Sequence, residues 1–228
     1  MTLSRITLTG LAAGAALVAA TAASAAKPQP APGPLAGAVH EAYQGTTAKG
    51  ASLTRVLDRG RVAAVSAGSL TVAEPGGASY TFILDAQTRV LGGVIQVGDR
   101  VAVSSDGSKA LAIRVRHGLR GAARGQSLRL LAGFVHATVD TTSRTGAHST
   151  FVYDRGQITS LSGGTVAVKR RDGASVSLTF DSTTTVREKG KPESVSDLEV
   201  GERAMFFSDA SGHVFLVRCV SKARTGSS

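Results

Sequence analysis

Apolar residues alternate with polar ones along most of this chain, in short runs that turn residues separate. The runs are rich in Val, Ile, Leu, Thr and Phe, and a glycine-containing turn follows roughly every eight to twelve residues. An alternation of this kind puts every second side chain on the same face of a strand, so it predicts strands with one buried face. Helix signals are few. The pattern therefore predicts an all-β protein.

The predicted strands fall into two groups of six. In the first group they lie near residues 38–43, 53–65, 69–73, 79–84, 100–104 and 110–116, and in the second near 134–139, 151–161, 165–169, 175–180, 203–207 and 214–220. Within each predicted strand every second residue is apolar, and these apolar side chains are expected to face inward. Pairs such as Pro75-Gly76 and Asp172-Gly173 stand between strands, and their turn chemistry predicts hairpins.

The two groups belong to an internal duplication. Residues 35–85 align with residues 131–181 at a constant offset of 96, without a gap, and 20 of the 51 positions are identical. A looser match resumes at Val97 and Val200 with an offset of 103, so the second copy has seven extra residues around 187–196. Length variation of this kind is typical of a surface loop.

Six short strands in about 85 residues would leave exposed edges in an open sheet. We therefore expect two tandem small β-barrel-like domains, with small β-sandwiches as the alternative. The expected organisation is a signal peptide (1–26), a Pro-rich tether (27–34), a first β domain (35–117), a basic linker (118–130), a second β domain (131–221) and a flexible tail (222–228).

Particular turn and core positions carry a family resemblance. The order Gly60-x-Val62, Asp85-x-x-Thr88 and Val97-Gly98-Asp99-Arg100 resembles the bacterial secreted family called domain of unknown function 5666. The second copy repeats it, for example in Gly156-x-Ile158 and Asp181-x-x-Thr184. The resemblance implies small exported β-barrels and no established activity.

The amino terminus predicts export. Arg5 precedes an apolar stretch that ends in Ala23-Ser24-Ala25-Ala26, the layout of a signal peptide cleaved near Ala25 or Ala26. No later run reaches the roughly 18 apolar residues of a membrane-spanning helix. The expected location is extracytoplasmic, either secreted or in the cell envelope. Cys219 is the single cysteine, so no intramolecular disulfide can form, and its apolar surroundings predict a buried, inert thiol.

Positive charge is concentrated in one segment. Residues 35–106 have six basic and six acidic residues, and residues 140–221 have ten of each. Residues 107–139 have no acidic residue and hold six basic ones: Lys109, Arg114, Arg116, Arg120, Arg124 and Arg129. The segment is therefore a localised positive region between two neutral bodies.

This basic segment is the candidate binding site. Arg114 and Arg116 share one face of the last predicted strand of the first copy, and Arg120, Arg124 and Arg129 continue across the connector. Acidic envelope polymers, nucleic acid or anionic lipid are the polyanions that such a surface could attract. The alternative is a solvated basic linker. We expect a non-catalytic binding protein.

Other candidate sites have simpler explanations. His40 and His136 are equivalent, but neither has a partner at metal-ligand spacing, so no metal or cofactor is predicted. The chain has no nucleophile elbow and no phosphate-binding glycine loop. Sugar binding is also disfavoured, because the chain has no Trp and most of its few Tyr and Phe fall on inward positions.

Two repeated acidic motifs are interpreted as structural. Asp58-Arg59-Gly60 and its repeat Asp154-Arg155-Gly156 are expected at a bend or bulge, with their charges facing water. Asp85 and Asp181 are expected to close Asx-turns. In the alternative hypothesis the protein is an enzyme or enzyme accessory, and its site forms in the cleft between the copies from the equivalent histidines or the Asp-Arg pairs.

Overall fold

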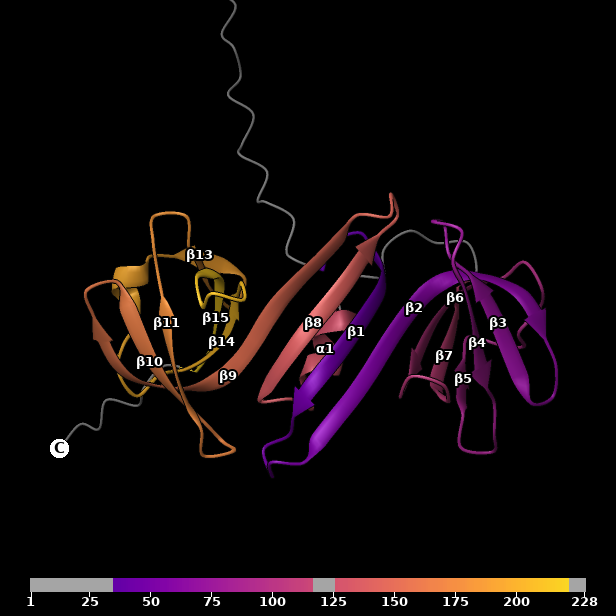
Figure 1. The fold of residues 1–228 in the computed structure, drawn as a ribbon, viewed down its shortest axis with the longest axis horizontal. Helices are drawn as coiled ribbons and strands as arrows, with labels where there is room; N and C mark the ends of the chain where they lie inside the picture. The colour runs from indigo at the N-terminus through magenta and orange to yellow at the C-terminus, as the bar shows by residue number, and fades with distance from the viewer. Residues whose placement is uncertain (1–34, 117–125, 222–228) are drawn as a thin grey trace, which may run out of the picture. The chain divides into compact units, whose positions relative to one another are not determined.

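The computed structural model describes residues 35–116 and 126–221, and within them the protein is all-β (Figure 1). It has a single 15-stranded sheet, one six-residue helix and one short 3-10 turn. None of the helices in this part of the chain is long and apolar enough to cross a membrane. The predicted signal peptide, the tether, most of the linker and the tail lie outside these residues.

Six predicted strands of the first copy are present. The first copy contains β1 (Ala38–Thr46), β2 (Ser52–Val65), β3 (Ser69–Ala73), β4 (Ser79–Ile83), β5 (Arg89–Leu91), β6 (Arg100–Ser105) and β7 (Ala110–Arg116). Only β5 was not predicted, because a three-residue strand between turns has no measurable alternation.

The second copy begins after a short helix. Its elements are α1 (Gln126–Leu131), β8 (His136–Ser143), β9 (His148–Ser162), β10 (Thr165–Arg170), β11 (Ser175–Thr179), β12 (Thr185–Glu188), β13 (Lys191–Glu193), η1 (Val195–Asp197), β14 (Arg203–Ser208) and β15 (Val214–Ser221). The extra residues of this copy include β13 and η1. Strand β13 forms a small hairpin with β12 and pairs with no other strand. The end of the predicted linker is α1.

Strand pairing repeats from one copy to the other. In the first copy β2 pairs with β1, β3 and β6, and in the second β9 pairs in the same way with β8, β10 and β14. The short strands β5 and β12 each run parallel to the last strand of their copy. The two copies of the duplicated sequence therefore share the same pattern of strand pairing.

The strands form one open sheet, whereas two tandem small β-barrel-like domains were expected. The sheet runs from β13 to β5, with the hairpins β3–β4 and β10–β11 as branches, and β1 pairs with β8 to join the copies. Two isolated bridges, Ile83 to Lys109 and Thr179 to His213, link the branch hairpins to the last strands without adding a strand pairing. In place of the expected barrel-like closure, each copy has one isolated bridge.

Each copy has its own apolar core, on the face that strand parity predicted. Val62, Leu70, Val72 and Phe82 belong to the first core, and Phe82 is 1% exposed. The matching residues of the second core include Ile158, Val166, Val168 and Leu178. Phe180 was also expected to point inward, but it is only partly buried and packs at the edge of that core.

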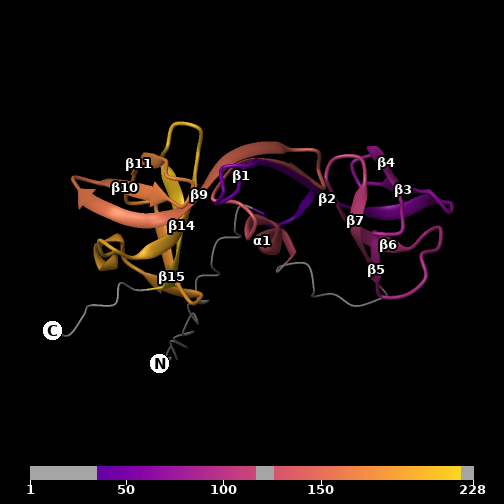
Figure 2. The same cartoon turned by 90° about the horizontal axis from the view of Figure 1, so that it is seen from below.

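A third cluster joins the copies. Tyr43 of β1 stacks on Phe134, with ring centroids 6.2 Å apart, and Leu131 of α1 lies in the same cluster. Phe151, Tyr153 and Phe207 of the second copy are its other buried aromatic residues. Figure 2 shows α1 close to β1. This shared cluster is buried beside the β1–β8 pairing.

Glycine at 60 and 156 is required by close packing between strands. A Cβ atom on Gly60 would lie 2.2 Å from the carbonyl oxygen of Ala73, and one on Gly156 would lie 2.5 Å from that of Lys169. Neither glycine has a positive φ, so backbone freedom does not explain them. The central strand of each copy can approach its neighbour only because this side chain is missing.

Candidate functional site

Arginines lie side by side across three strands of the first copy. Arg61 of β2 is opposite Arg100 of β6, and Arg100 is opposite Arg116 of β7. Arg114 follows on the same side of β7, because residues two apart in a strand share a face. We call Arg61, Arg100, Arg114 and Arg116 the arginine face. The core residues Val101 and Val115 are on the opposite side of the sheet.

The arginine face has unused hydrogen-bonding capacity. The buried Nε of Arg114, and the buried Nε and Nη2 of Arg116, have no hydrogen-bond partner. Within the described parts of the chain, none of the four arginines forms an ion pair with a carboxylate. Donors without partners in a folded protein are costly, so these guanidinium groups are suited to an anionic ligand.

The electrostatic environment of Arg116 is positive. Burial lowers the pKa of Arg116, and the charges of Arg59, Arg114 and Arg144 lower it further. Like charges on directly opposite strand positions repel each other. A bound polyanion would reduce this repulsion.

Arg59 differs from these four arginines because it is neutralised inside the protein. Its Nη1 forms an ion pair with Glu41 and donates to the carbonyl oxygen of Ala38 at 2.8 Å, and its Nη2 donates to Ser127 at 2.7 Å. Glu41 also accepts from Ser127 and Tyr43. The expectation that the Asp58-Arg59 charges face water is wrong, because Asp58 is fully buried and Arg59 belongs to this internal network.

The structure places three of the five predicted arginines. Arg114 and Arg116 belong to the arginine face, and Arg129 is exposed in the last turn of α1. Arg120 and Arg124 lie outside the described residues. Sequence reasoning missed Arg61 and Arg100, because only the pairing of β2, β6 and β7 shows that they are neighbours of Arg116.

The second copy presents a basic groove near the same strand positions. Arg203 is opposite Gln157, which in turn is opposite Lys169. The groove has a volume of about 320 Å³ and is lined by Arg155, Gly156, Gln157, Lys169, Arg170, Arg171, Arg203 and Val220. Positive charge on this side of the central strands is thus a feature of both copies.

The equivalent histidines each contact the aspartate of the neighbouring strand. His40 Nδ1 is 2.6 Å from Asp58 Oδ1, and His136 Nδ1 is 2.9 Å from Asp154 Oδ1. Both aspartates are buried. The hydrogen bond to Asp58 raises the pKa of His40, and the His40 ring stacks on Tyr80 with centroids 5.1 Å apart. The His-Asp pair is a site that sequence spacing did not predict.

The third member of each buried cluster differs in charge. In the first copy it is Glu74. Burial and the charge of Asp58 raise the pKa of Glu74 to about 7. In the second copy the equivalent position is Arg170, whose Nη1 donates to Asp154 Oδ1 at 2.9 Å. Arg170 also pairs with Asp172, 3.2 Å away.

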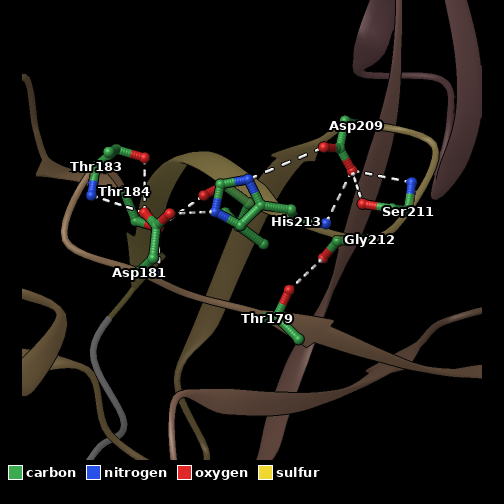
Figure 3. A network of polar contacts seen from close by, with 9 residues as sticks. Thr179, Asp181, Thr183, Thr184, Asp209, Ser211, Gly212 and His213 are labelled. Atoms are coloured by element: carbon green, nitrogen blue, oxygen red, sulfur yellow. Dashed lines mark hydrogen bonds and ion pairs between the residues drawn. The ribbon is translucent and has the colours of Figure 1, made fainter.

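The repeated Asp-x-x-Thr motifs are structural, as predicted. Asp181 Oδ1 accepts from the backbone N–H of Thr183 at 2.7 Å, which closes an Asx-turn, and Asp85 forms the same turn with Gln87. Figure 3 shows His213 between Asp181 and Asp209, with Nε2 2.8 Å from Asp181. In the first copy Lys109 makes the corresponding ion pair with Asp85. These networks anchor turns to the last strands.

Cys219 is free and buried, as expected. Burial raises the pKa of its thiol to about 12. A thiol with so little thiolate at neutral pH is a poor nucleophile, so Cys219 is assigned no role.

Comparison with known proteins identifies one matching family. Residues 59–115 match the family described as Domain of unknown function (DUF5666), which agrees with the resemblance noted in the first copy. This match lies within the first copy, and the family assignment of the second copy stays a prediction. No curated protein matches the chain.

Among solved structures, a Drosophila chain described as Unr CSD456 shows 12% sequence identity and a TM-score of 0.24. The similarity covers 75% of this chain and 63% of that one. At this TM-score it carries no argument about fold or function.

Proposed function

We propose that this protein is an exported, non-catalytic module that binds polyanions through the arginine face. The observation that carries the proposal is the row of four arginines on adjacent strands, none of which forms an ion pair with a carboxylate of the described residues. In this proposal both copies are small barrel-like units of the DUF5666 type. In the sequence, Arg120, Arg124 and Arg129 follow the last strand of the first copy and belong to the proposed binding segment.

Arginine is the appropriate residue for this role. Its planar guanidinium can give two parallel hydrogen bonds to a phosphate or carboxylate, and it keeps its charge in a partly buried setting. Four such groups on adjacent strands concentrate a positive potential that attracts a polymer with repeated negative charges. Phosphodiester or carboxylate polymers of the cell envelope are the ligands that fit an exported protein.

The proposal predicts that removing the face abolishes binding. A variant with Arg61, Arg100, Arg114 and Arg116 all changed to Gln should lose most of its affinity for a DNA duplex and for a phosphodiester cell-wall polymer. Gln should be compatible with the fold, because the second copy has Gln157 at the position equivalent to Arg61. Titration at low salt, followed by fluorescence anisotropy of the labelled polymer, measures the change.

The matched control removes the same charge elsewhere. In this variant four at least partly exposed cations away from the arginine face become Gln: Lys49, Arg187, Lys189 and Lys191. It should bind more tightly than the arginine-face variant and close to the level of the unmodified protein. Equal losses in the two variants, or no binding by the unmodified protein, would contradict the proposal.

A third variant, with Arg120, Arg124 and Arg129 changed to Gln, separates the linker from the face. The proposal predicts a partial loss, smaller than that of the arginine-face variant. If this variant loses all binding while the arginine-face variant keeps it, the site is the basic linker and the arginine face is not the binding surface.

A further inference from the structure

The two copies neutralise the same buried aspartate differently. In the second copy a cation from within the chain, Arg170, donates to Asp154. In the first copy the equivalent position holds a second acid, Glu74, beside Asp58. The clusters otherwise match, since a histidine of the preceding strand contacts the aspartate in each. The first copy therefore lacks the positive charge that the second supplies from its own sequence.

The acids of the first cluster are buried and have free oxygens. Asp58 has no solvent exposure and Glu74 is 7% exposed. Asp58 Oδ2 and Glu74 Oε1 have no hydrogen-bond partner. Two buried carboxylates in contact are strongly unfavourable unless a cation or a proton lies between them.

One potential ligand atom from each of His40, Asp58 and Glu74 lies within 4.8 Å of the other two. Two ligands of one Zn²⁺ ion are separated by roughly 3.4 Å in a tetrahedral site with bonds of about 2.1 Å. Movements of about 1 Å in the three ligand atoms would therefore place them all around a single ion. His40 lies on β1 and Asp58 on β2, and their register fixes both backbones. Glu74 directly follows β3, and its backbone N–H donates to the carbonyl oxygen of Ala78 at 2.8 Å.

We propose that His40, Asp58 and Glu74 form a binding site for a divalent transition-metal ion, with Zn²⁺ as the ion of best fit. One imidazole and two carboxylates are a borderline donor set that favours such ions over Mg²⁺ and Ca²⁺. A dication balances the two carboxylate charges. The His40 side chain is 20% exposed, so an ion can reach the site from its side, and solvent can supply the fourth ligand. The site is independent of the arginine face.

The second copy supplies the matched variants. Glu74→Arg introduces the residue that the equivalent position already tolerates in the second copy, and it should remove the tight Zn²⁺ equivalent from the protein. Arg170→Glu makes the reciprocal change, and it should add one equivalent. Isothermal titration of the whole protein with Zn²⁺ measures both. Glu74→Arg should weaken the tight site by at least tenfold.

A second measurement keeps the test independent of other zinc-binding groups. In nuclear magnetic resonance spectra, the His40 imidazole signals should shift or broaden when Zn²⁺ or Mn²⁺ is added to the unmodified protein, and should not respond to Mg²⁺. His213, which lies near Asp181 and Asp209, serves as the internal reference for nonspecific effects. The proposal is overturned if Glu74→Arg binds Zn²⁺ as tightly as the unmodified protein does. It is also overturned if only His213 responds.

Discussion

Phe82 and Leu178 fill equivalent positions in the two cores, and both are almost completely buried. Phe180, two residues beyond Leu178, shares its parity but lies at the edge of the core. Parity alone identifies which side of a strand a residue is on. How far the core extends along the strand depends on the neighbouring strands, which the sequence does not show.

This difference predicts unequal effects of truncation. Phe82→Ala should lower the free energy of unfolding by roughly 3 to 5 kcal/mol, because it leaves a cavity in a small core. Phe180→Ala should have a smaller effect, since its ring is already partly exposed. Chemical denaturation of the two variants measures both changes, and a larger loss for Phe180→Ala would show that our assignment of the core boundary is wrong.

The candidate sites were only partly predictable from individual residues. The Asx-turns of Asp85 and Asp181 could be predicted, since their partners are two residues away. The cluster of His40, Asp58 and Glu74 could not, because its successive members are 18 and 16 positions apart and meet only through strand pairing. The replacement of Glu74 by Arg170 appears in the alignment as one mismatch among many.

The strands themselves were predicted more reliably than their closure into barrel-like domains. All twelve predicted strands are present, because each has several alternating residues, whereas β5, β12 and β13 are too short to show a pattern. The branch hairpin of each copy meets the residue directly before the last strand through one isolated bridge, and the sheet continues from β1 to β8.

The close packing of β2 against β3 at Gly60 can be tested by substitution. Gly60→Ala should destabilise the protein by several kcal/mol, because the new methyl group would overlap the Ala73 carbonyl oxygen and the side chain of Val72. Gly68→Ala is the control, since a Cβ there has no atom within 4 Å. Thermal unfolding of the two variants should show a marked loss for the first and little change for the second. Similar midpoints would contradict the close approach.

At the scale of the whole molecule, the duplicated units share a structural core. Tyr43 of the first copy and Phe134 of the second stack in one cluster, and β1 and β8 pair along most of their lengths. Sequence length alone suggested that each copy folds independently. The shared cluster indicates that each depends on the other for part of its stability.

Separate expression of residues 35–116 and 126–221 tests this dependence. Each half should unfold at a lower denaturant concentration than the intact protein, because separation exposes the β1 and β8 edges and the aromatic cluster between them. Mixing the halves should raise both midpoints. Halves that are as stable alone as in the intact chain would contradict the shared core.

The proposed binding activity is tested most directly by its dependence on salt. Each cation that contacts a phosphate releases about one counterion, so it contributes about one unit to the slope of log affinity against log salt concentration. For a DNA duplex, the arginine-face variant should show a slope that is shallower by about one unit for each of its arginines that contacts a phosphate. The Lys49, Arg187, Lys189 and Lys191 variant should keep the slope of the unmodified protein. Equal slopes for all three proteins would contradict polyanion binding by the arginine face.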